Sequence, residues 1–241
     1  MAILFSFVLL VGVFVRRMIL NRKKQFRAKQ VAEQVAALAE EEPEIIEEKK
    51  LSKSEKGESS ALYEKGEALL VGGNDEEAIK CFVQVLAIDP GHLETLEKLA
   101  MLYLQKQMYS AACAFLKQLG EITQEAVHYS HLGLAHFQQA EYELAREAYQ
   151  KALELDGSRP QRYVSLSQVY KALGNMQNAI IALNKALEMD GENIDFMFLM
   201  ADLYLEKEMF DEAKKMLEEI LEKNPRSVEA KEALKKISRE T

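Results

Sequence analysis

Glycine, proline, cysteine and tryptophan are all scarce in this 241-residue chain, which has 11 Gly, 4 Pro, 2 Cys and no Trp. So few glycines and prolines provide few tight turns, and this excludes a β-sandwich, a β-barrel or another loop-rich fold. Two cysteines exclude a disulfide-stabilised scaffold and any site that needs four cysteine ligands. The apolar fraction of 48% is too high for a disordered chain. The composition therefore predicts a mostly helical, folded protein.

The sequence also lacks the motifs of the common enzyme classes. It contains no Walker loop, no GxGxxG, no GxSxG and no HExxH. His128 and His131 lie one helical turn apart, but His136 falls at a packing position and no nearby cysteine or carboxylate completes a metal site. We therefore predict that the protein is not an enzyme and uses no cofactor, metal or small-molecule substrate.

Acidic residues are absent from the N-terminal part of the chain. Residues 1–29 contain seven lysines and arginines and no acid, so the remainder carries 24 basic and 39 acidic side chains, a balance of −15. The net charge of −8 is thus the sum of a basic arm and a strongly acidic body. Such a body would repel phosphates, so nucleic-acid binding is not expected.

One long apolar run occurs, from Ala2 to Val15, and only Ser6 and Gly12 interrupt it. It is short against the roughly 20 residues of a usual span, but arginines at 16 and 17 can snorkel and the apolar residues 18–20 extend it. We predict an uncleaved transmembrane anchor over residues 1–20. Because the positive charge follows this run, the N-terminus would lie outside and the body in the cytoplasm. A cleaved signal peptide on a secreted or periplasmic protein is the alternative.

Two further segments precede the body of the chain. Residues 21–42 run from basic to acidic, which predicts a juxtamembrane helix. Its thin apolar stripe consists of Phe26, Val31, Val35, Leu38 and Ala39. The bilayer would be contacted by residues 2–20 and by the basic residues within 16–29. Pro43 ends this helix, and residues 43–58 are predicted to be a flexible charged linker.

The rest of the chain repeats itself with a period of 34 residues, most clearly in residues 126–159 and 160–193. Each copy has the pattern of two helices joined by a turn. A small residue recurs in the first helix, and a small residue followed four positions later by a bulky one recurs in the second. These recurring positions divide the chain into five units, 59–92, 93–125, 126–159, 160–193 and 194–227.

This pattern resembles the tetratricopeptide repeat (TPR) family. The resemblance implies an all-α fold, a right-handed α-solenoid of about five helical hairpins. The single transmembrane helix predicted from the apolar run would precede it, and residues 228–241 are predicted to form a capping helix and tail. In the cap, Val228, Ala230, Leu234 and Ile237 are expected on the buried side. The second unit is irregular, and its second helix is predicted to end near Gly120.

In the TPR family the first helix of each unit lines a concave groove that binds peptides or helices. Some family members bind the C-terminal carboxylate of a peptide ligand through Lys and Asn side chains on this surface. This chain has Tyr63 and Glu67 at those positions, so it is not expected to bind a carboxylate in that way. The surface is apolar with scattered acids and would suit a hydrophobic or amphipathic segment with basic flanks. When the family's groove positions are transferred to this sequence, the expected groove residues are Tyr63, Glu67, Leu70, Glu97, Met101, Leu104, Ser130, Leu134, Phe137, Val164, Gln168, Lys171, Phe198, Asp202 and Leu205.

The sequence therefore predicts a membrane-anchored scaffold or adaptor that binds protein partners at the cytoplasmic membrane face. A charge at Phe137 is expected to abolish partner binding without unfolding the array. A regulatory subunit of a membrane-associated enzyme is a further alternative. It resembles anchored bacterial repeat proteins that control lipopolysaccharide synthesis, but this chain has no CxxC for the metal knuckle that those proteins carry.

Overall fold

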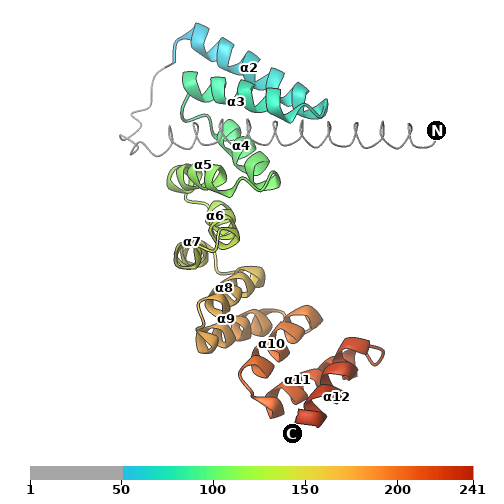
Figure 1. Cartoon of the computed structure of the whole chain (residues 1–241). Helices are drawn as coiled ribbons and strands as arrows, with labels where there is room; N and C mark the ends of the chain where they lie inside the picture. The colour runs from blue at the N-terminus through green and yellow to red at the C-terminus, as the bar shows by residue number, and fades with distance from the viewer. Residues whose placement is uncertain (1–50, 241) are drawn as a thin grey trace, which may run out of the picture. The chain divides into compact units, whose positions relative to one another are not determined.

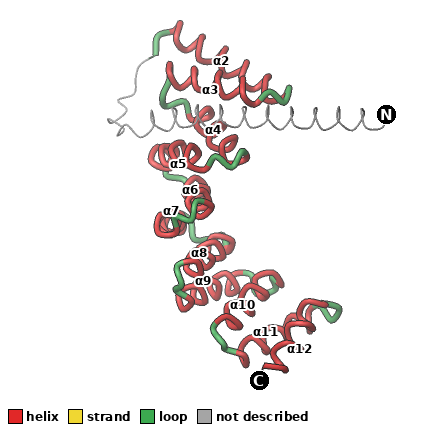
Figure 2. The backbone as a smooth tube through the Cα atoms, in the orientation of Figure 1, coloured by secondary structure: helices red, strands yellow, loops and turns green. Residues whose placement is uncertain are grey.

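The structure is a computed structural model that describes residues 51–240. The predicted anchor (1–20), the juxtamembrane helix (21–42) and the linker up to residue 50 lie outside the described residues. The described part contains eleven α-helices and no strand, which confirms the all-α fold (Figure 2). None of these helices is both long and apolar enough to cross a membrane.

The helices follow one another as hairpins joined by short turns (Figure 1). They form two compact units, one ending at Leu119 and the other beginning at Gly120, with the boundary inside α5. The first unit contains α2, α3, α4 and most of α5; the second contains the end of α5 and α6 to α12. The bounds are α2 Lys53–Val71, α3 Asp75–Ile88, α4 Leu93–Gln105, α5 Tyr109–Thr123, α6 Ala126–Gln138, α7 Tyr142–Leu155, α8 Pro160–Ala172, α9 Met176–Met189, α10 Ile194–Glu206, α11 Phe210–Lys223 and α12 Val228–Glu240.

Two kinds of contact hold each unit together. Within a hairpin the two helices pack along their length, as α2 does with α3, α6 with α7, α8 with α9 and α10 with α11. Between hairpins the second helix of one packs on the first helix of the next: α3 on α4 in the first unit, and α7 on α8, α9 on α10 and α11 on α12 in the second. Neighbouring repeats thus cover much of each other's apolar surface, as expected of a repeat array.

Helix α2 begins earlier than predicted. The sequence assigned residues up to 58 to a linker, but the helix starts at Lys53 because Ser52 and Glu55 form a capping box. The Ser52 hydroxyl accepts from the Glu55 amide at 3.2 Å, and the Glu55 carboxylate accepts from the Ser52 amide at 2.8 Å. The two reciprocal bonds satisfy amides that a helix start leaves unpaired, so residues 53–58 are helical.

The second hairpin does not close at Gly120 as predicted, because α5 continues to Thr123. Gly120 is buried inside the helix, and a Cβ there would lie 2.9 Å from the Tyr129 ring. The glycine therefore makes room for an aromatic ring of α6. Gln124, with φ of +53°, reverses the chain after the helix.

Helix α12 covers the end of the second unit with one side. Ala230 and Ile237 are buried in a core cluster with Leu217 and Ile220 of α11, and Leu234 packs against its edge. Val228 was expected on the same side, but 67% of it is exposed. Val228 is the first residue of the helix, and the contact with α11 begins only at Ala230.

Candidate protein-binding surface

In the first unit, the predicted groove residues share one face of α2 and α4. We call the faces formed by these positions the first-helix faces. Glu97 and Met101 are exposed, Met101 by 44%, and the other four are half-buried. The members are Tyr63, Glu67 and Leu70 on α2, and Glu97, Met101 and Leu104 on α4.

Tyr63 is fixed at the centre of an acidic part of this face. Its ring lies 5.7 Å from the Phe82 ring and 5.3 Å from the His92 ring, measured between centroids. Burial raises the pKa of the Tyr63 hydroxyl, and the nearby carboxylates of Glu67, Glu94 and Glu97 add to the rise. Lys98 opposes it and forms an ion pair with Glu67 at 3.2 Å. Because one lysine faces three carboxylates, the face presents negative charge to a ligand.

In the second unit, the predicted residues lie on the first helices α6, α8 and α10. Leu134, Gln168 and Asp202 are exposed, Leu134 by 39%, and the other six are half-buried. Met101, Leu134, Gln168 and Asp202 all occupy the same position of their repeats. The members are Ser130, Leu134 and Phe137 on α6, Val164, Gln168 and Lys171 on α8, and Phe198, Asp202 and Leu205 on α10.

Several of these side chains contribute to packing as well as to the face. Phe137 lies 5.5 Å from Tyr142 and packs against the core cluster of α7 and α8, whereas Phe198 and Leu205 pack against the cluster of α10, α11 and α12. Val164 similarly packs against α9 and α10. A carboxylate at Phe137 would enter a core cluster and lower stability, so Leu134 is the better place for a charge.

Ser130 has a structural partner that the sequence analysis did not identify. Its hydroxyl donates to the Ala126 carbonyl at 2.8 Å and accepts from Arg162 Nε at 3.2 Å. Arg162 is 7% exposed, and its Nη1 donates to both the carbonyl and a carboxylate oxygen of Asp156, each at 2.6 Å. The only signal in the sequence was an arginine at a position that holds Thr95, His128 and Phe196 in other repeats.

The α8 and α10 part of the face is acidic. Lys171 is paired with Glu206, so its charge is neutralised within the face. Burial raises the pKa of the Asp202 carboxyl, Lys171 lowers it and Glu206 raises it again. Asp202 is therefore a partly desolvated carboxylate whose nearest cation already has a partner, and such a group attracts a cationic side chain.

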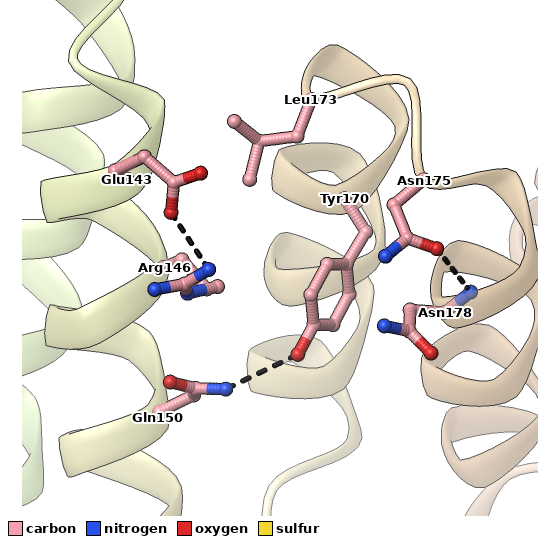
Figure 3. Close-up of a pocket in the computed structure, with 7 residues that line it drawn as sticks. All are labelled: Glu143, Arg146, Gln150, Tyr170, Leu173, Asn175 and Asn178. Atoms are coloured by element: carbon pink, nitrogen blue, oxygen red, sulfur yellow. Dashed lines mark hydrogen bonds and ion pairs between the residues drawn. The ribbon is translucent and has the colours of Figure 1, made fainter.

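A separate pocket of about 400 Å³ lies among α7, α8 and α9 of the second unit (Figure 3). Its polar groups largely satisfy one another: Arg146 pairs with Glu143 at 2.7 Å, and Gln150 donates to the Tyr170 hydroxyl at 3.1 Å. The sequence gives no signal for this pocket, because its residues come from three helices and from the turn between α8 and α9. The lining consists of Glu143, Arg146, Gln150, Tyr170, Leu173, Asn175 and Asn178.

The histidines form separate contacts. His136 Nδ1 lies 2.6 Å from a carboxylate oxygen of Glu141, and the buried His128 lies 3.8 Å from Glu125. Within residues 51–240, no group of three or more His, Cys, Asp or Glu side chains is arranged to hold a metal ion.

Family comparison agrees with the repeat pattern. Models described as tetratricopeptide repeat match residues 59–92, 126–158 and 171–237. Among curated proteins, the TPR repeat-containing protein YpiA of Bacillus subtilis (strain 168) is 30% identical over 134 residues, which cover 55% of this chain and 31% of YpiA. The chain thus spans about a third of that relative's length.

Solved structures show the same arrangement of helices. A crystal structure of the MamA protein matches with a TM-score of 0.65 and 30% identity, over 70% of this chain and 94% of that one. YrrB, described as a TPR protein with an unusual peptide-binding site, matches with a TM-score of 0.63 and 19% identity, over 75% of this chain and 93% of that one. At that identity, YrrB shows the fold alone.

Proposed function

We propose, because the chain belongs to the tetratricopeptide repeat family, that it is a scaffold whose first-helix faces bind protein partners. Binding rather than catalysis is the activity that we assign. The observation that carries the proposal is the exposure of Met101 and Leu134, by 44% and 39%, at the same position of two repeats. Neither side chain belongs to a described core cluster, and each lies on a face that also holds carboxylates.

The partner chemistry follows from these neighbours. Apolar side chains of a partner would cover Met101 on the face of the first unit, or Leu134 on the face of the second, because removing apolar surface from water is favourable. Basic side chains flanking them would meet Glu97 in the first unit and Asp202 in the second, where the nearby lysines are already paired. The proposed ligand is therefore a hydrophobic or amphipathic segment with lysine or arginine flanks. YrrB supports only the point that this arrangement of helices can carry a peptide site.

We place this scaffold at the cytoplasmic face of a membrane, with residues 1–20 as the anchor and the N-terminus outside. The support is the apolar run followed by seven basic residues within 1–29. Carbonate extraction of membranes from cells that express the full chain tests the anchor, and N-terminal sequencing tests its retention. Release by carbonate, or a mature start beyond residue 20, would exclude it and favour the cleaved, secreted form.

Peptide selection tests the binding face. Random peptides displayed on phage are selected against the full-length protein, and the enriched peptides are measured for affinity at low and high salt. We expect apolar anchors with Lys or Arg flanks, and binding that weakens as salt screens the flanking charges. Enrichment of acidic peptides, or affinity independent of salt, would contradict the assigned chemistry.

The chain offers a matched control for the location of the site. Leu134→Asp on α6 should reduce affinity for the selected peptides roughly tenfold or more, because it places a carboxylate under an apolar side chain. Ile181→Asp on the second helix α9 makes the same change at a side chain that is 57% exposed and outside the face. Equal effects of the two substitutions, or none from Leu134→Asp and Met101→Asp, would refute binding at the first-helix faces.

A further inference from the structure

We call the side of a first helix that faces the preceding hairpin its outward side. The outward side of α2 differs from that of every later first helix. In α4, α6, α8, α10 and α12, two positions seven residues apart are buried, whereas the corresponding Ala61 and Ala68 of α2 are exposed. The buried pairs are Thr95 and Leu102, His128 and Ala135, Arg162 and Val169, Phe196 and Leu203, and Ala230 and Ile237.

The contacts within each unit explain the burial on α4, α8, α10 and α12. Helix α3 packs on α4, α7 on α8, α9 on α10 and α11 on α12, so the second helix of one hairpin covers the outward side of the next first helix. Helix α2 is the first helix of the described chain, and no second helix precedes it between residue 51 and its start.

The uncovered side of α2 has an apolar centre, formed by the exposed Ala61 and Ala68. The exposed Glu64 and Lys65 flank this centre, and Val71, the last residue of the helix, is 92% exposed. The exposed side of the other end helix, α12, shows what a solvated end of this array carries. Its exposed charged residues are Glu229, Lys231, Glu232, Lys235 and Lys236.

The chain upstream of α2 contains a segment with the pattern of a second helix. Val31, Val35, Leu38 and Pro43 are separated by four, three and five residues. The same separations relate Ala78, Phe82, Val85 and Pro90 in and after α3, and Ala213, Leu217, Ile220 and Pro225 in and after α11. All six of those apolar residues are at most 1% exposed. The spacing is therefore that of the side chains with which second helices pack.

We propose that residues 26–42 of this chain form a helix that packs on the outward side of α2, in the place of the second helix of a preceding hairpin. The proposal goes beyond partner binding at the first-helix faces and is independent of it. Its consequence is that the basic residues within 16–29 are joined to the first unit through a packed helix instead of a free tether.

The intervening chain is long enough for this arrangement. Nine residues, 43–51, join the segment to the N-cap Ser52, and they span up to about 30 Å when extended. The distance to be bridged has two parts. Helix α2 begins six residues before the first repeat position, so the connection must run about 9 Å further along the helix axis. It must also cross the spacing of about 8–10 Å between two packed helices. The connection therefore reaches from the end of the segment to the start of α2 with length to spare.

Site-specific photocrosslinking in the full-length, membrane-reconstituted protein tests the proposal. A benzophenone amino acid replaces Ala68, and the crosslinked peptides are identified by mass spectrometry. We expect intramolecular capture of residues 26–42. The same probe at Ala87, exposed on α3, should not capture them. Capture of lipid, of a second copy of the chain, or of residues outside 26–42 would overturn the proposal.

Substitutions in the segment separate packing from proximity. Val35→Asp with Leu38→Asp places charges on the apolar stripe and should reduce crosslinking roughly tenfold. Gln30→Asp with Ala37→Asp adds the same charges on the other side of the segment and should leave crosslinking unchanged. Amide hydrogen exchange of α2 should increase with the first pair alone. Equal effects of both pairs, or no effect of either, would refute a packed helix.

Discussion

Gly133 lies directly against the ring of Tyr149, so that a Cβ at residue 133 would be 2.8 Å from Tyr149 Cδ2. Gly66 and Phe82 make the same contact in the first hairpin, where a Cβ would be 2.6 Å from Phe82 Cε1. In the other three hairpins the second helix contributes leucine instead of an aromatic residue, and the first helix contributes alanine or serine instead of glycine. The sizes of the two contacting residues are thus complementary: the larger residue on one helix faces the smaller residue on the other. Those three pairs are Ala100 and Leu116, Ser167 and Leu183, and Ala201 and Leu217.

This size matching predicts a change of sign in a double-mutant cycle. Alanine normally stabilises a helix by about 1 kcal/mol relative to glycine. Gly133→Ala should nevertheless destabilise the protein by about 1–2 kcal/mol, because overpacking against Tyr149 outweighs the propensity gain. In a Tyr149→Leu background the same substitution should stabilise, since it recreates the alanine–leucine pair of other hairpins. Urea unfolding followed by circular dichroism measures all four proteins. Destabilisation of similar size in both backgrounds would contradict the matching.

The turns inside the hairpins provide a stabilising substitution. The second residue after the first helix ends has φ near +60° to +74° in several hairpins. It is Gly73 or Gly174 in two of them but Ala140 in another. A left-handed conformation costs a non-glycine residue roughly 1–2 kcal/mol. Ala140 is exposed, so Ala140→Gly removes that cost without loss of packing and should stabilise by about 1 kcal/mol.

The matched control for Ala140→Gly is Ala87→Gly. Ala87 is also exposed but lies in the last turn of α3, where the backbone is right-handed and glycine costs up to roughly 0.5–1 kcal/mol. The two substitutions should therefore shift the urea midpoint in opposite directions. A loss of stability from both would show that the turn at residue 140 does not impose the positive φ.

The repeat spacing was sufficient to predict the hairpins, because small and bulky side chains recur wherever two helices touch. Helix ends were predicted less well. Gly120 has the residue type of a helix end, but its environment, the Tyr129 ring, gives it another role. The start of α2 was predictable in principle, since Ser52 and Glu55 have the S-x-x-E spacing of a capping box.

The binding face was harder to predict than the fold. A family position specifies which side of a helix a residue occupies, but exposure depends on the neighbouring hairpin. Leu134 and Phe137 both belong to the predicted face, yet Phe137 packs against the cluster of α7 and α8 while Leu134 is 39% exposed. The role of Arg162 depends on the Asp156 turn and on Ser130, which lie 6 and 32 residues away in the sequence.

We predict that the Asp156 carboxyl, in the turn after α7, contributes to the stability of the folded protein in a way that depends on pH. Hydrogen bonds from Ser158, and then from Arg162, hold the pKa of the Asp156 carboxyl well below its usual range. A lowered folded-state pKa stabilises the protein fully above the unfolded-state value of about 3.9. That contribution is lost as the pH falls through the folded-state pKa.

The difference in stability between the wild type and Asp156→Asn should therefore stay constant from pH 7 to about pH 5 and shrink below about pH 4. Urea midpoints measured at each pH give this difference. Arg162→Gln removes one donor that favours the charged carboxylate, so the folded-state pKa of Asp156 should rise. In that background the decline should still begin near pH 4, but it should be smaller and stop at a higher pH. A difference that persists unchanged to pH 3 would show that Asp156 is not held in its charged form.

We predict that the buried Tyr103 hydroxyl lowers the stability of the folded protein at alkaline pH. Tyr103 is 1% exposed, its ring stacks on Phe115 at 5.7 Å, and its hydroxyl has no hydrogen-bond partner among residues 51–240. Tyr103→Phe keeps the stacked ring and removes a buried unpaired polar group. At pH 7 the substitution should therefore be neutral or stabilise by up to about 1–2 kcal/mol.

Burial also raises the pKa of Tyr103 to about 12. An unfolded tyrosine ionises near pH 10, so stability is fully present below that pH and is lost as the pH rises from about 10 towards 12. By pH 11 the wild type should have lost about 1 kcal/mol more than Tyr103→Phe, because only the wild type can ionise at this position. The other tyrosines are common to both proteins and cancel in the comparison. Parallel stability curves from pH 9 to pH 11 would mean that the hydroxyl reaches water in the folded protein.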